Sequence, residues 1–475
     1  MAIATVAGRL IPGRGELRPM VRLAVPVVVV QVGLMMMGVV DTVMVGHLSA
    51  VALAAVALGH LYFFGIGVFA MGTLMVLDPV VAQAVGARDE AGVARGIQRG
   101  VLLAVVLTVP SVAVLLAAGP VLTLARQPAE ILPLATGYIV RLAPGVLPFF
   151  LFIVFRQSLQ ALRRTAAIVA AIVVANIVNA ALNWVLIFGH GSPALGVFGS
   201  AWATSISRWV LLGVLLALAW DDLQPRLRRR YPEVRELAPL GRMLRLGLPI
   251  GIQYVLEFGA FAFVALMMGW LGTHEMAGHQ VAINLASLTF MVPLGVGDAA
   301  SVLVGHAVGR ADPAGARGSA RAALACGAGF MACTALIFLT FPGALARLYS
   351  TDARVVALAA ALVPLAGVFQ VFDGLQVVAG GILRGLGETR VAMLVNVLGY
   401  WLLGLPVSYL LGFRAGMGPV GLWWGLVVGL AVVATVLLVR VRIALNRQQR
   451  RVVIDRAGDP APHGWSPIPS PGARD

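Results

Sequence analysis

Long apolar stretches, separated by short segments rich in charge, Gly or Pro, fill almost the whole chain. Each stretch is long enough to supply the roughly 20 apolar residues that a helix needs to cross the hydrocarbon core of a bilayer. The pattern predicts an all-α integral membrane protein with twelve transmembrane helices in two lobes of six. The expected spans are 21–47, 53–84, 97–125, 132–161, 166–189 and 194–220, then 244–271, 276–308, 318–346, 353–383, 390–412 and 418–444.

The two sets of spans are related by an internal repeat. An offset of 223 residues pairs Pro26 with Pro249 and aligns segment 84–92 with segment 307–315 at six identical positions. Each half has an even number of spans, so both halves enter the membrane from the same side. The repeat is therefore parallel, about an axis along the membrane normal. We expect the substrate path to lie between the two halves, near the middle of the membrane.

This division gives five parts: a cytoplasmic N-terminal segment (1–20), an N-lobe (21–221), a cytoplasmic linker (222–243), a C-lobe (244–445) and a cytoplasmic tail (446–475). The tail is rich in Arg, then in Pro, Gly and Ser, a composition that cannot bury a core. We expect the tail to be disordered.

Composition argues against a soluble protein and against two kinds of enzyme. The chain is 60% hydrophobic and 12% charged, whereas a soluble globular domain carries about 25% charged residues. All 35 basic residues are arginine, so there is no Lys for a Walker A nucleotide loop or for a Schiff base. The seven histidines have no metal-ligand spacing, and no Ser/His/Asp order stands out. We expect a transporter that is not an enzyme and needs no cofactor.

The arginines also predict an orientation. Most of them lie in the N-terminal segment, in alternate loops, in the linker and in the tail, which the positive-inside rule assigns to the cytoplasm. Both termini are then cytoplasmic. The net charge of +15 is explained by topology in a lipid bilayer rather than by a nucleic-acid partner.

Three carboxylates lie inside these apolar spans: Asp41, Glu257 and Asp373. An acid at the centre of a membrane helix costs roughly 2.5 to 3.5 kcal/mol on insertion scales, so it is by default a candidate for ion or substrate handling. No arginine lies within ten residues of Glu257 or Asp373. We expect each to exchange a proton or bind a cation. Helical spacing places these residues near the two acids: Gln253, Tyr254 and Phe261 near Glu257, and Phe369, Gln370, Gln376 and Val377 near Asp373.

The expected partners of Asp41 are amides and hydroxyls on the fifth and sixth spans: Asn176, Asn179, Asn183, Ser200 and Thr204. Carboxylate, amide and hydroxyl oxygens are the ligands that a small hard cation prefers, and a carboxylate alone can hold a proton. A sodium ion is accordingly possible at Asp41, Asn179 and Asn183, or at Glu257 and Asp373. The alternative is that these groups only join helices, at about 0.6 kcal/mol per hydrogen bond.

Three further polar residues lie at positions that suggest other roles. Asp78 precedes Pro79, and Asp298 follows a glycine-rich run, which favours capping of restarted half-helices by both aspartates. Arg208 lies in the sixth span, where it is either a counter-charge or extends to the cytoplasmic edge.

Several motifs resemble the multidrug and toxic compound extrusion (MATE) family, NorM-like branch. They are the run Pro26 to Gln31, the run Gly38 to Ala50 with Asp41 at its centre, Leu53 to Ala57, Gln83 to Gly86, the Glu257 helix, Asp373 to Gln376, and Gly381 to Gly385. The resemblance covers residues 20–445. It implies a monomeric, two-lobed antiporter of a bacterial plasma membrane that exports amphipathic cationic drugs and dyes against an inward sodium or proton gradient.

The resemblance also implies roles for individual residues. Asp41 is similar to the N-lobe carboxylate, with Asn179 and Asn183 in its polar cluster, while Glu257 and Asp373 are similar to the C-lobe cation site. The chain departs from the family pattern at Asn183, where some relatives have an acid, and at Phe369, where NorM-like proteins have a Tyr. Both departures affect the choice of coupling ion.

Two competing functions remain open. A lipid-linked oligosaccharide flippase of the same superfamily would need fixed arginines for a pyrophosphate, and only Arg141, Arg156 and Arg208 lie inside spans. A cation channel would not need acids divided between two lobes. We favour an antiporter with alternating access, in which an ion from outside binds the carboxylates and displaces a cationic drug. The coupling ion, the stoichiometry and the natural substrate stay open.

Overall fold

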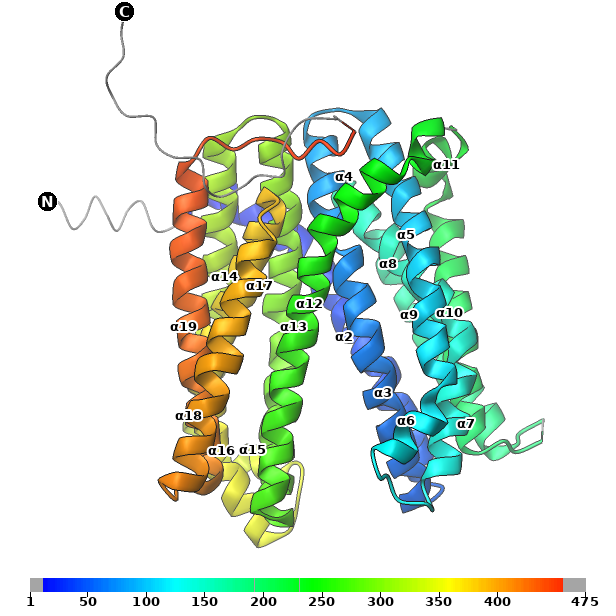
Figure 1. Ribbon diagram of the computed structural model, residues 1–475, viewed down its shortest axis with the longest axis vertical. Helices are drawn as coiled ribbons and strands as arrows, with labels where there is room; N and C mark the ends of the chain where they lie inside the picture. The colour runs from blue at the N-terminus through cyan, green and yellow to red at the C-terminus, as the bar shows by residue number, and fades with distance from the viewer. Residues whose placement is uncertain (1–11, 192, 230, 456–475) are drawn as a thin grey trace, which may run out of the picture.

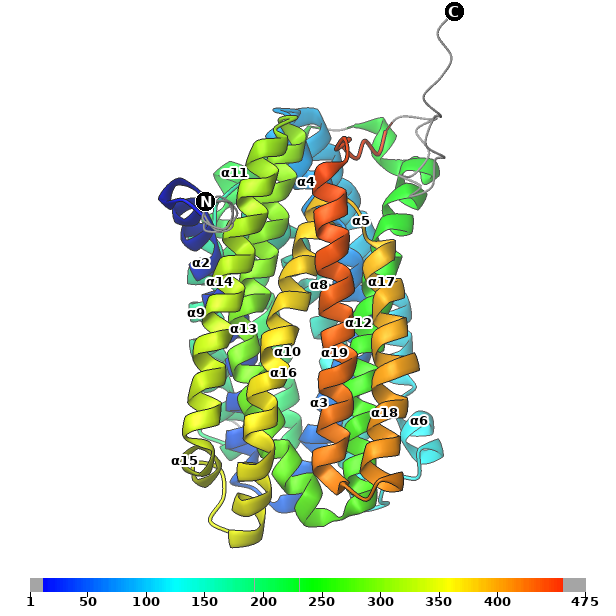
Figure 2. The same ribbon diagram turned by 90° about the vertical axis from the view of Figure 1, so that its left-hand side faces the viewer.

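The computed structural model describes residues 12–191, 193–229 and 231–455. Within these residues the chain is helical apart from turns and short connections. Twelve helical segments are long and apolar enough to cross a membrane, which confirms the predicted fold class. Figure 1 shows them upright in two bundles, and Figure 2 shows the C-lobe side after a quarter turn.

The N-lobe contains α2 (Arg14–Gly46), α3 (Ala50–Leu74), α4 (Leu77–Gly86), α5 (Glu90–Leu116), α6 (Ala118–Leu124), α7 (Leu132–Leu142), the 3-10 turn η1 (Ala143–Gly145), α8 (Val146–Ala161), α9 (Ala166–Phe188) and α10 (Val197–Leu218). The second span is thus broken at residues 75–76 rather than continuous over 53–84. A short helix α11 (Trp220–Arg228) and the 3-10 turn η2 (Pro232–Arg235) form the linker.

The C-lobe contains α12 (Leu237–Leu271), α13 (Thr273–Gly309), α14 (Pro313–Thr340), α15 (Pro342–Arg347), α16 (Ala353–Leu386), α17 (Arg390–Asn396), the π-helix η3 (Val397–Gly404), α18 (Leu405–Tyr409), the π-helix η4 (Leu410–Arg414) and α19 (Gly418–Asn446). The eleventh span is therefore partly π-helical. Gly399 and Gly404 in η3 lie against Gly429 of α19, a close approach that a side chain at any of them would obstruct.

Equivalent residues begin equivalent helices in the two lobes. Asp89 accepts a hydrogen bond of 2.8 Å from the backbone N–H of Gly92 at the start of α5. Asp312, which is 223 residues later, accepts the same bond of 2.8 Å from Gly315 at the start of α14. An aspartate in this position satisfies one of the free N–H groups of a first helical turn. The repeat in the sequence is therefore a repeat in local structure.

Each lobe has its own hydrophobic core, and α2 contributes to both. Its early residues Met20, Leu23 and Ala24 belong to the core of the C-lobe, whereas Val30 and Met37 belong to the core of the N-lobe. The first turns of α2 therefore cross to the opposite lobe. A lobe boundary at residue 21 therefore assigns α2 to the N-lobe by sequence, although its first turns pack in the core of the C-lobe.

The lobes meet at the end of the molecule where α4 and α11 lie, at the top of Figure 1, and the ribbons diverge toward the other end. The contact follows the repeat. Gly86 of α4 lies against His306 of α13, and Gly309, the equivalent of Gly86, lies against Gln83, the equivalent of His306. Small residues let membrane helices approach closely, so these glycines permit a tight pseudo-symmetric seam.

Hydrogen bonds reinforce this seam. The Gln83 side-chain amide donates 2.9 Å to the carbonyl of Gly385 in α16, and His306 Nε2 lies 2.8 Å from the carbonyl of Ala161 in α8. Both bonds join one lobe to the other. The arginine distribution predicts that this closed end faces the cytoplasm.

Two sequence-based expectations are wrong. Asp298 lies within the continuous helix α13, so no half-helix restarts there for it to cap. Asp78 lies in the first turn of α4, but no side-chain cap bond forms at that end. The tail also differs from expectation: residues 447–455 make specific contacts, whereas residues 456–475 lie outside the described residues.

Candidate functional site

Asp41 lies on α2 in a cluster of neutral hydrogen-bond donors. Its side chain is 1% exposed. Oδ1 accepts bonds of 2.6 Å from Asn183 and 3.1 Å from Asn179 of α9, and Oδ2 accepts a bond of 2.6 Å from the Thr204 hydroxyl of α10. The i, i+4 spacing of the asparagines brings both amides to one carboxylate oxygen. The structure thus places a buried acid against three uncharged side chains.

Two aromatic residues that the sequence did not single out complete this N-lobe cluster. His60 of α3 places Nε2 3.8 Å from Asp41 Oδ2, and the same nitrogen lies 2.7 Å from the hydroxyl of the fully buried Tyr138 of α7. Gly59 makes room for Tyr138, because an added Cβ there would overlap its ring. His60 therefore connects Asp41 to a second buried polar group.

Two of the predicted partners of Asp41 do not reach it. Asn176 donates instead to the backbone carbonyls of Gly33 at 3.0 Å and Ile172 at 2.8 Å. The fully buried Ser200 side chain lies next to Tyr138 instead. Asn176 thus joins α9 to α2.

The C-lobe cluster joins three elements through Gln376. The amide nitrogen of Gln376 on α16 donates 2.9 Å to Glu257 Oε1 on α12, and its oxygen accepts 3.0 Å from the hydroxyl of Tyr400 on η3. Tyr400 is 1% exposed. Glu257 is partly buried. Sequence reasoning placed Gln376 near Asp373 but gave no signal for Tyr400, which is presented by an irregular π-helical segment.

Asp373 lies one turn before Gln376 and is the least satisfied of the three acids. It is 6% exposed, and its Oδ1 has no hydrogen-bond partner among the described residues. Glu257 is close enough to act on it electrostatically. Phe369, one turn earlier, packs edge to face on Phe261 with ring centroids 5.8 Å apart. The two acids therefore lie near each other, and among the described residues the amide of Gln376 is the group that bonds one of them.

The other predicted C-lobe residues have different neighbours. Gln370 is fully buried and bonds the hydroxyls of Thr289 and Thr334, at 2.7 and 2.9 Å, so it joins α16 to α13 and α14. Tyr254 packs against Gly72 of the N-lobe and lies beside Arg384. Gln253 is 7% exposed on α12. Among the described residues, no hydrogen bond joins these three side chains to Glu257 or Asp373.

A third buried cluster crosses the seam between the lobes. Arg384 of α16 places Nη2 3.2 Å from Asp298 of α13 and Nε 3.8 Å from Asp78 of α4. Asp298 also accepts 3.0 Å from Gln31 of α2, which in turn accepts 3.2 Å from Arg156 of α8. The positive charges of Arg384 and Arg156 offset the negative charges of Asp78 and Asp298. Asp78 and Asp298 therefore belong to an inter-lobe charge network and not to helix caps.

The open question about Arg208 has a structural answer. Arg208 is 9% exposed, and its guanidinium lies 4.0 Å from the ring centroid of Phe63 and 5.0 Å from that of Phe149. It is close enough to Asp41 to act on it electrostatically. Arg208 is therefore held inside the N-lobe on aromatic faces, where cation–π attraction stabilises it, and does not extend to the edge of the membrane.

A cavity of about 310 Å³ on the closed face lies apart from these acids. Arginines from both lobes, Arg88, Arg163 and Arg310, line it together with His306. All three arginines are exposed. Because they also follow the positive-inside pattern, topology already accounts for their position.

The two acidic clusters offer carboxylate, amide and hydroxyl groups. Within the described ranges, no group of three His, Cys, Asp or Glu side chains could hold a metal ion. A bound cation would be held by one or two carboxylates with neutral oxygens, a donor set suited to a proton or a hard monovalent ion. Each lobe carries one such cluster.

Comparison with known proteins agrees with this architecture. The family model MatE matches residues 26–185 and 249–410, one block in each lobe. A probable multidrug resistance protein NorM of Rhizobium meliloti is 39% identical over 87% of this chain and 91% of its own. A multidrug resistance protein MdtK of Edwardsiella ictaluri is 35% identical over 93% of this chain and 98% of its own.

Solved structures share the fold. The eukaryotic MATE transporter AtDTX14 superimposes with a TM-score of 0.82 at 24% identity, covering 90% of this chain and 98% of its own. An outward-facing multidrug resistance MATE family transporter gives a TM-score of 0.83 at 21% identity, covering 92% of this chain and 97% of its own.

Proposed function

Because this chain belongs to the MATE family of membrane transporters, we propose that it is a secondary active antiporter that exports amphipathic cationic drugs and dyes. The exchanged ion is an inward-moving sodium ion or proton. The chain would work as a monomer in a bacterial inner membrane, with both termini in the cytoplasm.

One observation carries this proposal: acids held by uncharged groups lie in both lobes. Asp41 bonds two amides and a hydroxyl, and Glu257 bonds one amide, while one oxygen of Asp373 has no partner within the part of the chain that the structure describes. An ionised carboxylate in an apolar environment is costly unless a positive charge neutralises it. A proton, a sodium ion or a cationic drug would supply that charge, so ion and drug compete for the same acids.

The inter-lobe contacts support alternating access. The Gly86–His306 and Gly309–Gln83 contacts close one end, and the ribbons of the lobes diverge toward the other. An ion from outside would bind the acids in this arrangement and release the drug outward. Opening to the cytoplasm would then require the seam to separate while the lobes rock about the site.

The driving force depends on charge balance. Exchange of one monovalent drug for one monovalent ion moves no net charge, so a membrane potential worth about 2.3 kcal/mol per charge per 100 mV would not contribute. The chemical gradient of the ion would then supply the energy unless more ions than drug charges move in each cycle.

The three arginines that the sequence predicts inside spans weigh against a lipid-linked oligosaccharide flippase. Arg141 bonds the Gly137 carbonyl at 2.8 Å and lies on the Phe198 ring, Arg156 bonds Gln31, and Arg208 lies on Phe63. They have separate partners and do not form one cluster for a pyrophosphate. Closure of one end also weighs against a cation channel.

The test is efflux of a fluorescent cationic dye from proteoliposomes with an imposed sodium or proton gradient. We expect wild type to accelerate efflux, and Asp41→Asn, Glu257→Gln and Asp373→Asn each to lose most of the acceleration. The matched control is Asp352→Asn, because Asp352 is an acid at the start of α16 whose cap role Asn can take over. Full gradient-driven efflux by all three site variants would contradict the proposal.

A further inference from the structure

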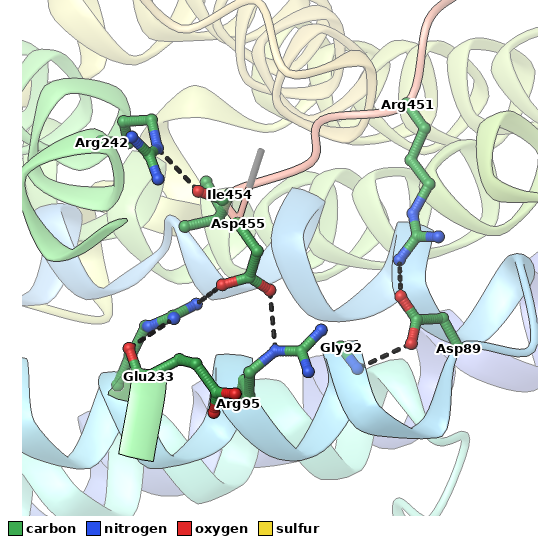
Figure 3. A network of polar contacts seen from close by, with 9 residues as sticks. Asp89, Gly92, Arg95, Glu233, Arg242, Arg451, Ile454 and Asp455 are labelled. Carbon is green, nitrogen blue, oxygen red and sulfur yellow. Dashed lines mark hydrogen bonds and ion pairs between the residues drawn. The ribbon is translucent and has the colours of Figure 1, made fainter. Parts of the chain in front are cut away.

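The segment after the last helix crosses from one lobe to the other. Helix α19 ends at Asn446 in the C-lobe. Residues 447–455 then extend along the closed face to the start of α5 in the N-lobe (Figure 3). A segment of that length reaches about 30 Å when extended, which is enough to cross the seam.

Ion pairs attach this segment to α5. Arg451 lies 2.6 Å from Asp89, and Asp455 lies 2.7 Å from Arg95 and 2.6 Å from Arg99 (Figure 3). Arg99 is 1% exposed and also donates 2.8 Å to the Glu233 carbonyl in the linker. The end of the segment thus binds a basic site on α5 that is formed by Arg95 and Arg99.

Backbone and apolar contacts add to the ion pairs. The Val452 N–H donates 2.7 Å to Gln83 Oε1, the side chain whose nitrogen bonds Gly385 across the seam. Ile454 is 6% exposed within the N-lobe core cluster, and its carbonyl accepts 2.6 Å from Arg242 of α12. The segment therefore contacts both lobes at the point where they meet.

The docking surface is specific to the N-lobe. The repeat places Gly318 and Ala322 of the C-lobe at the positions of Arg95 and Arg99. Asp312 keeps the cap role of Asp89, and its nearest arginine is Arg310 at 4.0 Å. If the repeat alone explained these arginines, both lobes would carry them. The arginines that pair with Asp455 occur in the N-lobe but not at the equivalent positions of the C-lobe.

We propose that residues 447–455 form a latch that holds the lobes together on the cytoplasmic side and favours the outward-facing arrangement. The inference rests on the proposed alternating access. The latch must release from α5, or stretch, before the seam can open. It adds a regulated step because the contact can be weakened without altering the acids that bind the ion.

The test measures the separation of the lobes on the cytoplasmic side. Spin labels are placed at two exposed arginines, Arg164 of the N-lobe and Arg317 of the C-lobe, in full-length protein with Cys326 and Cys333 replaced by Ala. Distance distributions are recorded by electron–electron double resonance in lipid nanodiscs, and dye efflux of the same variants is measured in proteoliposomes.

The variants separate charge from capping. Asp89→Asn removes the partner of Arg451 but keeps a side chain that caps helices equally well. Asp312→Asn makes the same change at the equivalent site without the latch and is the matched control. Asp455→Asn and Arg451→Gln change the segment itself, so the test does not depend on α5 tolerating a substitution.

We expect the population with long cytoplasmic distances to rise roughly threefold to fivefold in Asp89→Asn, Asp455→Asn and Arg451→Gln, as loss of partly exposed ion pairs allows. Asp312→Asn should match the parent. Unchanged distances in all three, or an equal shift in Asp312→Asn, would overturn the latch. If the parent fails to exchange dye for ions while the distances still shift, the latch stands and the proposed antiport fails.

Discussion

Gln376 donates a hydrogen bond of 2.9 Å to Glu257 while it accepts one of 3.0 Å from Tyr400, so one amide orients an acid of the C-lobe. Tyr400→Phe removes the hydroxyl group that bonds Gln376 and leaves the rest of the side chain in place. A single buried hydrogen bond contributes about 0.5 to 1.5 kcal/mol. We expect the apparent affinity for the coupling ion to change roughly fivefold, as read from efflux rates against ion concentration.

Tyr409→Phe is the control for that prediction, because Tyr409 lies on the same span and is exposed. An equal effect of the two substitutions would show that the eleventh span as a whole tolerates no change, and it would contradict a specific role of Tyr400.

Closure of the seam between the lobes depends on Gly309, which lies against the Gln83 carbonyl. Gly309→Val should prevent close approach of the lobes and hold the protein open to the cytoplasm. Dye efflux should fall at least tenfold. A cysteine introduced at the seam should become accessible to a water-soluble maleimide. Gly329→Val is the control, since an added Cβ at Gly329 meets no atom within 4 Å. Normal efflux by Gly309→Val would contradict the closed seam.

Stability depends on Arg384, which neutralises two buried aspartates from opposite lobes. Arg384→Met leaves Asp78 and Asp298 with less compensation, and breaking a buried ion pair costs about 3 to 5 kcal/mol. The unfolding temperature in detergent should drop clearly. Arg414→Gln, an exposed arginine on η4, should change it little.

A rescue experiment separates charge from shape at this site. Adding Asp78→Asn and Asp298→Asn to Arg384→Met removes the uncompensated charges and should restore part of the unfolding temperature. A triple variant as unstable as Arg384→Met would mean that Arg384 acts through packing instead.

The latch should be insensitive to pH in the physiological range. Burial alone would raise the pKa of Asp89, but the Gly92 N–H and the Arg451 guanidinium hold it below the ordinary value of 3.8. A carboxyl with a lowered pKa stabilises the latched form above its ordinary pKa and loses that effect as the pH falls through the lowered value. The difference in cytoplasmic distances between the parent and Asp89→Asn should therefore stay constant from roughly pH 5 to 8 and shrink only below about pH 4. A transition near neutral pH that Asp89→Asn abolishes would contradict this assignment.

The spans and the repeat were predictable from the sequence because hydropathy and a fixed offset are properties of the chain alone. The grouping of Asp41 with Asn179, Asn183 and Thr204 was predictable for a similar reason, since i, i+4 spacing puts polar side chains on one helix face. Which face meets which neighbour is a tertiary property. His60, Tyr138 and Tyr400 were missed on that account.

Gln370 and Gln376 illustrate the same limit. Each lies three residues from Asp373, on opposite sides of it, so their side chains point about 120° apart around the helix. Only Gln376 faces the acids. Asp298 illustrates another limit: Gly295 and Gly297 suggested a broken helix, but they pack closely on Val28 and Val377 while α13 continues.

The central claim is that an ion and a cationic drug move in opposite directions through one cycle. The most direct measurement records dye efflux and ion influx together in the same vesicles, with a pH-sensitive or sodium-sensitive dye inside and the membrane potential clamped. We predict that outward movement of the cationic dye drives inward movement of one of the two ions, and that Asp41→Asn and Asp373→Asn reduce both fluxes together. Dye efflux with no accompanying flux of either ion would contradict the account.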